Sequence, residues 1–256
     1  MTSTSKFIIG CNHSGSHTDT PIKVLDYLKS GNFVWVEHED ELISDMNLLE
    51  IKESINYKVF TEISLEEQIL ETKAMLESGK NVMFLTHMGY PGTADPGSDL
   101  IREIRLMGFE IEIIAGPSIA PMAVALSGIV KSEKGYLVRE TFTDDIDSIK
   151  EYLNKIKNIS EVLVFIDFNH KTLEIVSSML NEFEEDRQAS IIINGGMKNQ
   201  IVIDGSYTEI LKKIESYPKV EIKKILNFMG SEPEDIEISE ILNDALVTIV
   251  SKGKHL

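Results

Sequence analysis

Two glycine-bearing turns constrain the fold of this chain more than any other feature of the sequence. They span 89–97 and 115–118, and each follows a strand-like apolar run, at 81–85 and at 110–114. Each turn also opens an apolar segment that can form a helix. In an open α/β sheet, ligands bind outside the carboxyl ends of the strands, where glycine lets the backbone approach the ligand and helix N-termini offer unpaired N–H groups. The two turns therefore predict a ligand site at one edge of a sheet.

The remainder of the first half shows the same alternation of strands and helices. A strand, a polar turn, a helix beginning near Pro21 and a second strand are expected in this order: 6–10, 11–20, 21–30 and 33–36. The apolar face of that helix should consist of Ile22, Leu25, Tyr27 and Leu28. Farther on, Ser64 and Glu67 form a capping box that starts a helix ending at Ser78. Its apolar face should contain Leu65, Ile69 and Leu76.

The second half repeats the pattern after a polar stretch at 131–147, which we expect to be a linker. The predicted domains are therefore 1–130 and 148–256. Helices are expected at 146–156, 171–183 and 207–214, and strands at 162–166, 189–193, 201–205 and 245–250. An acidic loop should precede the last strand. Such alternation predicts an α/β fold of two domains, each with a mixed, mostly parallel sheet.

Composition restricts the setting in which the protein works. The chain has 256 residues, of which 42% are hydrophobic, with no long apolar run and no leader-like N-terminus, so we expect a soluble cytoplasmic protein without membrane association. A single cysteine, Cys11, excludes an internal disulfide and agrees with a reducing compartment. The formal net charge is −17, so non-specific attraction to nucleic acid should be weak over most of the surface.

The residues of the glycine turns resemble the tetrapyrrole methylase family. The first turn reads T-H-M-G-Y-P from Thr86, followed by D-P-G at 95–97, and the second reads A-G-P-S at 115–118. The similarity is greatest to the branch of bacterial small-subunit rRNA cytidine 2′-O-methyltransferases, which has S-D-A-G-T-P, D-P-G and P-G-P-S in these places. A second motif, N-G-G-M-K-N-Q at 194–200, is similar to the family pattern N-G-T, three residues, Q. The resemblance covers about residues 6–215.

The resemblance implies an S-adenosylmethionine-dependent methyltransferase with its cofactor in a cleft between the two α/β domains. Its methionine part should be held by Gly89, Tyr90 and Thr93 of the first turn. Further contacts should come from the second turn and from the second domain: Ser118, Ile119, Asp167, Asn194 and Gly195. The resemblance also implies a homodimer.

The candidates for acid-base chemistry are Glu37, His87 and Asp167. Each can take or hold the proton of a methyl acceptor, since a hydroxyl becomes a better nucleophile as its proton is withdrawn. The alternative is that each is simply a strand-end or turn residue. His13 and His17 have a spacing that can suit a metal, but no third ligand is visible in the sequence, so no metal site is expected.

The methyl acceptor stays open at this stage between RNA, a macrocycle and a peptide. An rRNA ribose 2′-hydroxyl is favoured by the turn motifs, and the cations available to hold RNA near the expected cleft are Arg139, Lys171 and Lys198. The acidic charge instead favours a tetrapyrrole-like macrocycle or a peptide backbone amide. A third possibility is a non-catalytic cofactor-binding module, because the loop Cys11–His17 departs from the family pattern and His87 stands where the rRNA branch has an acid.

Overall fold

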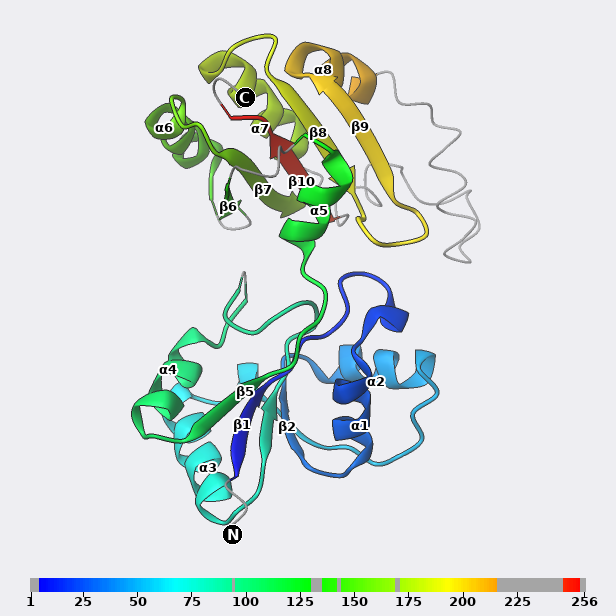
Figure 1. Cartoon of the computed structure of the whole chain (residues 1–256), viewed down its shortest axis with the longest axis vertical. Helices are drawn as coiled ribbons and strands as arrows, with labels where there is room; N and C mark the ends of the chain where they lie inside the picture. Colours follow the sequence, from blue (N-terminus) through cyan, green and yellow to red (C-terminus); the bar gives the residue numbers. More distant parts are fainter. Residues whose placement is uncertain are drawn as a thin grey trace. The chain divides into compact units, whose positions relative to one another are not determined.

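The chain folds into two compact units, Met1–Ser118 and Ile119–Leu256. The structure is a computed structural model (Figure 1). The residues that it describes are 5–93, 95–129, 135–141, 144–168, 171–215 and 246–253. The predicted acidic loop before the last strand lies outside these residues.

The first unit contains a parallel five-stranded sheet in the order β3-β2-β4-β1-β5. The strands are β1 (Lys6–Ile9), β2 (Phe33–Val36), β3 (Asn56–Val59), β4 (Val82–Phe84) and β5 (Glu110–Ile113). The helices are α1 (Ile22–Lys29), α2 (Glu39–Leu48), α3 (Leu65–Glu77) and α4 (Ser98–Leu106), with short 3₁₀ turns at His17–Asp19 and Phe60–Glu62. The two glycine turns connect strands to helices, as predicted: the first joins β4 to α4, and the second joins β5 to α5 (Ile119–Ser127).

Helices cover both faces of this sheet, which is why its strands are apolar without strict alternation. Successive side chains of β1 point to opposite faces: Phe7 and Ile9 pack with α3 and α4, whereas Ile8 packs with α1 and α2. Figure 1 shows the two helix pairs on either side of the sheet. In this three-layer arrangement the helices cover the faces of the sheet, and the carboxyl ends of the strands are surrounded by loops.

Two predicted helix faces need correction. In α1 the buried residues are Val24 and Leu28, while Ile22 is 75% exposed because it lies in the first turn, off the stripe that faces the sheet. In α3 the capping box of Ser64 and Glu67 is confirmed. Leu65, however, is exposed, and the buried face contains two polar residues, Gln68 and Thr72.

Those buried polar side chains have hydrogen-bond partners. The amide of Gln68 donates to the carbonyl oxygens of Phe60 and Ile63, at 2.9 and 2.8 Å. The hydroxyl of Thr72 accepts a bond of 2.9 Å from the indole nitrogen of Trp35. A hydrophobicity pattern does not reveal such pairs, because it carries no information on hydrogen-bond partners, and Trp35 lies 37 positions away from Thr72.

The second unit has a five-stranded sheet in the order β6-β7-β10-β8-β9. Its strands are β6 (Tyr136–Glu140), β7 (Val162–Phe168), β8 (Gln188–Ile193), β9 (Ile201–Ser206) and β10 (Leu246–Ser251). Its helices are α5 (Ile119–Ser127), α6 (Ile146–Ile156), α7 (Thr172–Glu182) and α8 (Tyr207–Glu215). Helix α5 packs on one face of the sheet and the other three pack on the opposite face.

The two α/β units and a mixed second sheet agree with the expectation, but the second sheet is not mostly parallel. Only β6 and β7 pair in parallel, whereas β7 with β10, β10 with β8, and β8 with β9 are antiparallel. The reason for the last pair is local. Residues 194–200 form a short turn between β8 and β9, and a parallel pair would need a crossover of a dozen or more residues.

The stretch expected to be a linker contains structure. Strand β6 lies within 131–147, and its Tyr136, Leu137 and Val138 are partly exposed because β6 is at the edge of the sheet. The division between the units comes earlier, after Ser118. Helix α5 belongs to the second unit because Ala120 and Ala123 are buried among its strands β7, β8 and β10.

Candidate functional site

The loops after β1 and β4 are fastened to one another at the carboxyl ends of these strands. The amide of Asn12 donates to the carbonyl of Gly89 at 2.9 Å, and the amide of Gly89 donates to the carbonyl of His13 at 3.0 Å. The side-chain amide of the buried Asn12 also donates to the carbonyl of His87 at 2.7 Å. The first glycine turn is thereby held in a defined position next to the loop Cys11–Thr20.

Two of the predicted catalytic residues, Glu37 and His87, lie together in the first unit. Glu37 follows β2, and its Oε2 accepts a hydrogen bond of 3.1 Å from the backbone amide of His87. Nδ1 of the His87 ring lies 2.5 Å from Oε1 of Glu41, a residue of helix α2. Together with Asn12 and Asp45, these residues line a small cavity of about 20 Å³, which has room for one water molecule. This group can accept or hold a proton.

The first glycine turn has the open backbone that a ligand held by main-chain atoms needs. Gly89 has φ of 66°, and a Cβ atom added there would meet no heavy atom within 4 Å. Thr93 is exposed, and its amide closes the turn by donating to the carbonyl of Tyr90 at 3.2 Å. The turn therefore leaves room for a ligand that main-chain groups bind.

The second turn differs from the first. Gly116 donates its amide to the hydroxyl oxygen of Tyr90 at 2.7 Å, which joins the two turns. A Cβ atom at Gly116 would lie only 2.6 Å from Sγ of Cys11 and 2.9 Å from Cγ of Pro21. Glycine is required here by packing against the loop after β1, and Ser118 follows two residues later, half-buried, at the end of the first unit.

The second unit holds the remaining predicted residues. Asn194 has φ of 51°, a conformation that is uncommon for any residue except glycine, and Gly195 is buried next to Ile119, whose Cδ1 lies 3.4 Å from the position of an added Cβ. Asp167 is buried on β7, where Oδ2 accepts from the hydroxyl of Thr141 and lies 3.6 Å from Nζ of Lys171. Asp167 is thus held by structural partners.

All three cations expected to hold RNA have partners within the protein. Arg139 donates to Oδ2 of Asp144 at 2.6 Å and its guanidinium lies 4.7 Å from the ring centre of Tyr152. Lys171 donates to the carbonyl of Thr141 at 2.9 Å. Reversal of either charge would disturb the second unit as well as any bound RNA, so these residues are unsuitable for a clean test of RNA binding.

Burial raises the pKa of the Cys11 thiol to about 11, and a hydrogen bond with Tyr90 lowers it only in part. Burial also raises the pKa of the Tyr90 hydroxyl. Burial would raise the pKa of Asp45 as well, but hydrogen bonds from His13 and Asn12 outweigh it and hold that pKa below its ordinary value. Asp45 is therefore a carboxylate at neutral pH.

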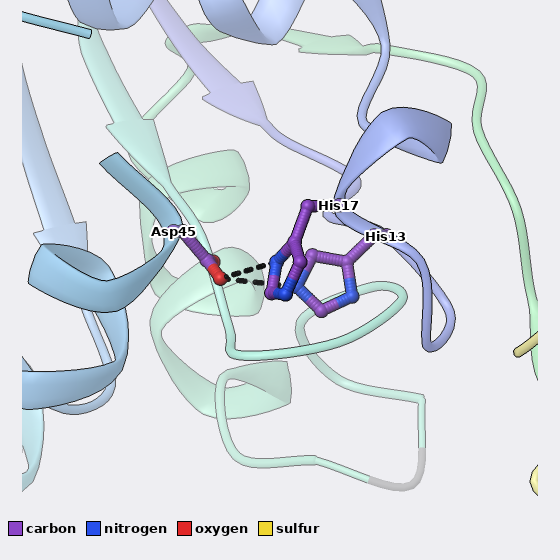
Figure 2. Close-up of side chains that lie close together, drawn as sticks. All are labelled: His13, His17 and Asp45. Atoms are coloured by element: carbon purple, nitrogen blue, oxygen red, sulfur yellow. Dashed lines mark hydrogen bonds and ion pairs between the residues drawn. The ribbon is translucent and has the colours of Figure 1, made fainter. Parts of the chain in front are cut away.

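Asp45 also lies next to His13 and His17, for which no third metal ligand could be predicted from the sequence (Figure 2). The residues that the sequence analysis missed here are Asn12, Glu41 and Asp45. A signal for the two acids exists, since Glu37, Glu41 and Asp45 follow each other at intervals of four residues, the spacing of one helix face. No comparable signal exists for Asn12, whose partners come from three separate segments.

Comparisons with known proteins agree with this architecture. The sequence model of the tetrapyrrole (corrin/porphyrin) methylases matches residues 14–211. The ribosomal RNA small subunit methyltransferase I of Thermotoga maritima is 27% identical over 223 residues, which cover 87% of this chain and 98% of that protein. The protein of the same name from Bacillus subtilis is 25% identical over 201 residues, covering 77% of this chain and 66% of its own length.

Solved structures share the fold at lower sequence identity. The methyltransferase CobJ superposes with a TM-score of 0.62 at 13% identity, covering 98% of this chain and 95% of its own. The cobalamin biosynthetic enzyme cobalt precorrin-4 methyltransferase CbiF gives a TM-score of 0.59 at 15% identity, with the same two coverages. Within the part of the chain that the structure describes, no helix combines the length and apolar character needed to cross a membrane.

Proposed function

The chain belongs to the tetrapyrrole methylase family and is an S-adenosylmethionine-dependent methyltransferase, and on this basis we propose that its acceptor is a ribose 2′-hydroxyl of small-subunit ribosomal RNA. The main support is the agreement of the turn motifs with relatives that are named ribosomal RNA small subunit methyltransferase I. Those relatives match over 87% and 77% of this chain, and the family model, which matches residues 14–211, includes both glycine turns.

When bound, S-adenosylmethionine supplies a methyl group on a positively charged sulfur, ready for in-line attack by an oxygen. The open backbone at Gly89, with Tyr90 and Thr93, would hold its methionine part, together with Ser118 from the second turn. Ile119, Asn194, Gly195 and Asp167 are the proposed contacts from the second unit. Because a methyl transfer needs mainly alignment and exclusion of water, most of the rate enhancement would come from positioning.

Glu37 and His87 are the proposed proton acceptors of the first unit. A ribose hydroxyl has to lose its proton as it attacks the methyl group, and Glu37 has one carboxylate oxygen that the amide of His87 does not engage. The contact between the His87 ring and Glu41 orients that ring. We assign Asp167 a positioning role in the second unit, since it is buried beside Thr141 and Lys171.

A second acceptor class is favoured by one observation. The formal net charge of −17 opposes the approach of a polyphosphate chain, whereas a macrocycle or a peptide amide meets no such barrier. We also propose that the protein acts as a cytoplasmic homodimer, for which the partly exposed apolar side chains of the edge strand β6 are available. Light scattering at micromolar concentration tests the dimer, and a monomer would exclude it.

Methyl transfer from labelled S-adenosylmethionine to each acceptor class tests the proposal. The small ribosomal subunits are isolated from cells that lack their own enzyme of this family. The amount of labelled methyl group on these subunits should increase with each catalytic cycle of the enzyme. Uroporphyrin-type macrocycles and unmodified peptides should accept none. Label on either of the latter, with none on the subunits, would replace RNA by that acceptor. Tight binding of S-adenosylmethionine without transfer to any of the three would favour the non-catalytic module.

A further inference from the structure

Three side chains in the first unit bring their ligand atoms together in a way that the methyl transfer does not explain. His13 and His17 come from the loop after β1, and Asp45 comes from α2 (Figure 2). One ring nitrogen of each histidine and one carboxylate oxygen lie within 4.8 Å of one another. The contact distances are 3.3 Å from His13 Nε2 and 2.8 Å from His17 Nδ1, both to Oδ1 of Asp45.

These separations are close to those around a single metal ion. Nitrogen and oxygen ligands at about 2.0–2.2 Å from a tetrahedral ion stand about 3.4 Å apart. The distance from His13 to Asp45 already has this value, and that from His17 to Asp45 has to increase by roughly half an ångström. Side-chain movements on the order of 1 Å would therefore complete the coordination.

The ring of His17 gives a second observation. Its Nδ1 is buried and makes no hydrogen bond, although Asp45 Oδ1 lies 2.8 Å away. The two atoms are near each other but not aligned as donor and acceptor. A buried polar atom without a hydrogen bond is uncommon and calls for an explanation, and a cation between the nitrogen and the oxygen would satisfy both.

The surroundings of the cluster fix two of the three ligands. The side chain of Asn12 donates to Oδ2 of Asp45 at 3.1 Å, which orients the carboxylate and leaves Oδ1 directed at the histidines. His13 is 2% exposed, and its ring packs edge-on against those of His17 and His87. His17, whose side chain is 33% exposed, provides the side from which an ion can enter.

We propose that His13, His17 and Asp45 bind one divalent transition-metal ion of the Zn²⁺ class. Two imidazoles and one carboxylate suit Zn²⁺ or Co²⁺ better than Mg²⁺ or Ca²⁺, which prefer sites made of oxygen ligands. The three ligands leave a further position open. The ion fastens the loop after β1 to α2, beside the turn at Gly89 to which the same loop is hydrogen-bonded.

Metal binding also requires a local change of the backbone, at Gly15. Its amide donates to Nδ1 of His13 at 3.2 Å, so in the neutral ring the proton is on Nε2. Coordination through Nε2 moves this proton to Nδ1, and the contact with the Gly15 amide has to open. Gly15 has φ of 110°, which only glycine adopts readily, and the peptide can therefore turn away at low cost.

Titration calorimetry on the metal-free, untagged protein with ZnCl₂ or CoCl₂ tests the site without any methyl acceptor or cofactor. We expect one ion per chain, visible ligand-field bands with Co²⁺, and a rise in melting temperature with Zn²⁺. In the NMR spectrum the amide of Gly15 should shift on addition of Zn²⁺. Binding of Mg²⁺ in preference to Zn²⁺, or no binding of any of these ions, would overturn the proposal.

Two substitutions test the ligands. Asp45→Asn keeps the shape of the side chain and the contact with Asn12, and His17→Ala removes a ring that is partly exposed, so both variants should fold. Each should lose at least about tenfold in affinity for Zn²⁺. The matched control is His38→Ala, an exposed histidine of the same unit outside the cluster, which should bind Zn²⁺ as the wild type does. Equal affinity of the wild type and both folded variants would contradict the site, whatever the outcome of methylation assays.

Discussion

The backbone amide of His87 donates a hydrogen bond of 3.1 Å to Oε2 of Glu37, although the two residues are 50 positions apart in the sequence. Their strands, β4 and β2, are neighbours in the parallel sheet, so the residues that follow them meet at one edge. This contact places a carboxylate from one loop against the turn that leads to Gly89. From this arrangement we infer that Glu37 removes the proton of the methyl acceptor.

Glu37→Gln tests that assignment. The amide oxygen of glutamine can still accept from His87, so the fold and the affinity for S-adenosylmethionine should stay within twofold. The loss of the carboxylate should lower kcat for methyl transfer by about 10²–10⁴. Single-turnover kinetics measure the effect, with Glu66→Gln, the same substitution at an exposed glutamate of the first unit, as the control. A kcat unchanged from the wild type would remove Glu37 from the mechanism.

Gly89 and Gly116 should respond differently to substitution, although the sequence motifs present them as equivalent. Gly116→Val forces a side chain into Cys11 and Pro21 and should cost about 1–3 kcal/mol in the free energy of unfolding. Gly89→Ala has free space and bears only the left-handed backbone cost of about 1–2 kcal/mol, but it projects a methyl group where the ligand should lie. Urea denaturation and calorimetry separate the two effects. Normal cofactor affinity in the Gly89 variant would show that this turn does not contact the ligand.

Thr72→Val should destabilise the first unit without touching the site. The valine has nearly the same volume, but the buried indole N–H of Trp35 loses its acceptor. An unsatisfied buried donor costs about 1–3 kcal/mol. Chemical denaturation followed by the fluorescence of this single tryptophan measures the loss. The exposed Thr18→Val is the control, and equal stability of both variants would contradict the buried hydrogen bond.

The reactivity of Cys11 should depend on pH in a way set by its burial. In the folded state the thiol keeps its proton up to about pH 11, against an ordinary pKa of 9.0. Between pH 9 and pH 11 the thiol of the folded state therefore keeps its proton, whereas that of the unfolded state has lost it. The contribution of Cys11 to the free energy of unfolding is fully present below pH 9 and is lost as the pH rises to 11. The rate of alkylation by iodoacetamide should be very low at pH 8 and rise toward pH 11. Rapid alkylation of the native protein at pH 8 would mean that Cys11 is accessible and ionised.

Local sequence patterns predict much of the fold and miss what depends on distant contacts. The capping box at Ser64 and the first glycine turn could be predicted because their hydrogen bonds and backbone conformations involve neighbouring residues. Helix α2 was not predicted, since only Leu42 is buried and its polar residues give no apolar stripe. Strand β3 was missed for a similar reason, because Asn56 and Lys58 alternate with partly buried residues at the edge of the sheet.

The candidate site follows the same rule. Glu37 and His87 could be predicted as strand-end residues, because the order of strands in a parallel sheet brings such ends together. The contributions of Asn12 and Asp45 could not be predicted, since they depend on how α2 packs against the loop after β1. No third metal ligand for His13 and His17 could be predicted, because Asp45 lies on α2, a helix that the sequence pattern does not indicate.

The chemical identity of the methylated product tests the proposed function most directly. Small ribosomal subunits treated with the enzyme and labelled S-adenosylmethionine are digested to nucleosides, which are then separated and weighed by mass spectrometry. We expect label in a single 2′-O-methylated nucleoside from the small-subunit RNA, strongly reduced with the Glu37→Gln enzyme. Label in a base-methylated nucleoside, in ribosomal protein, or in no component of the subunit would contradict the proposed function.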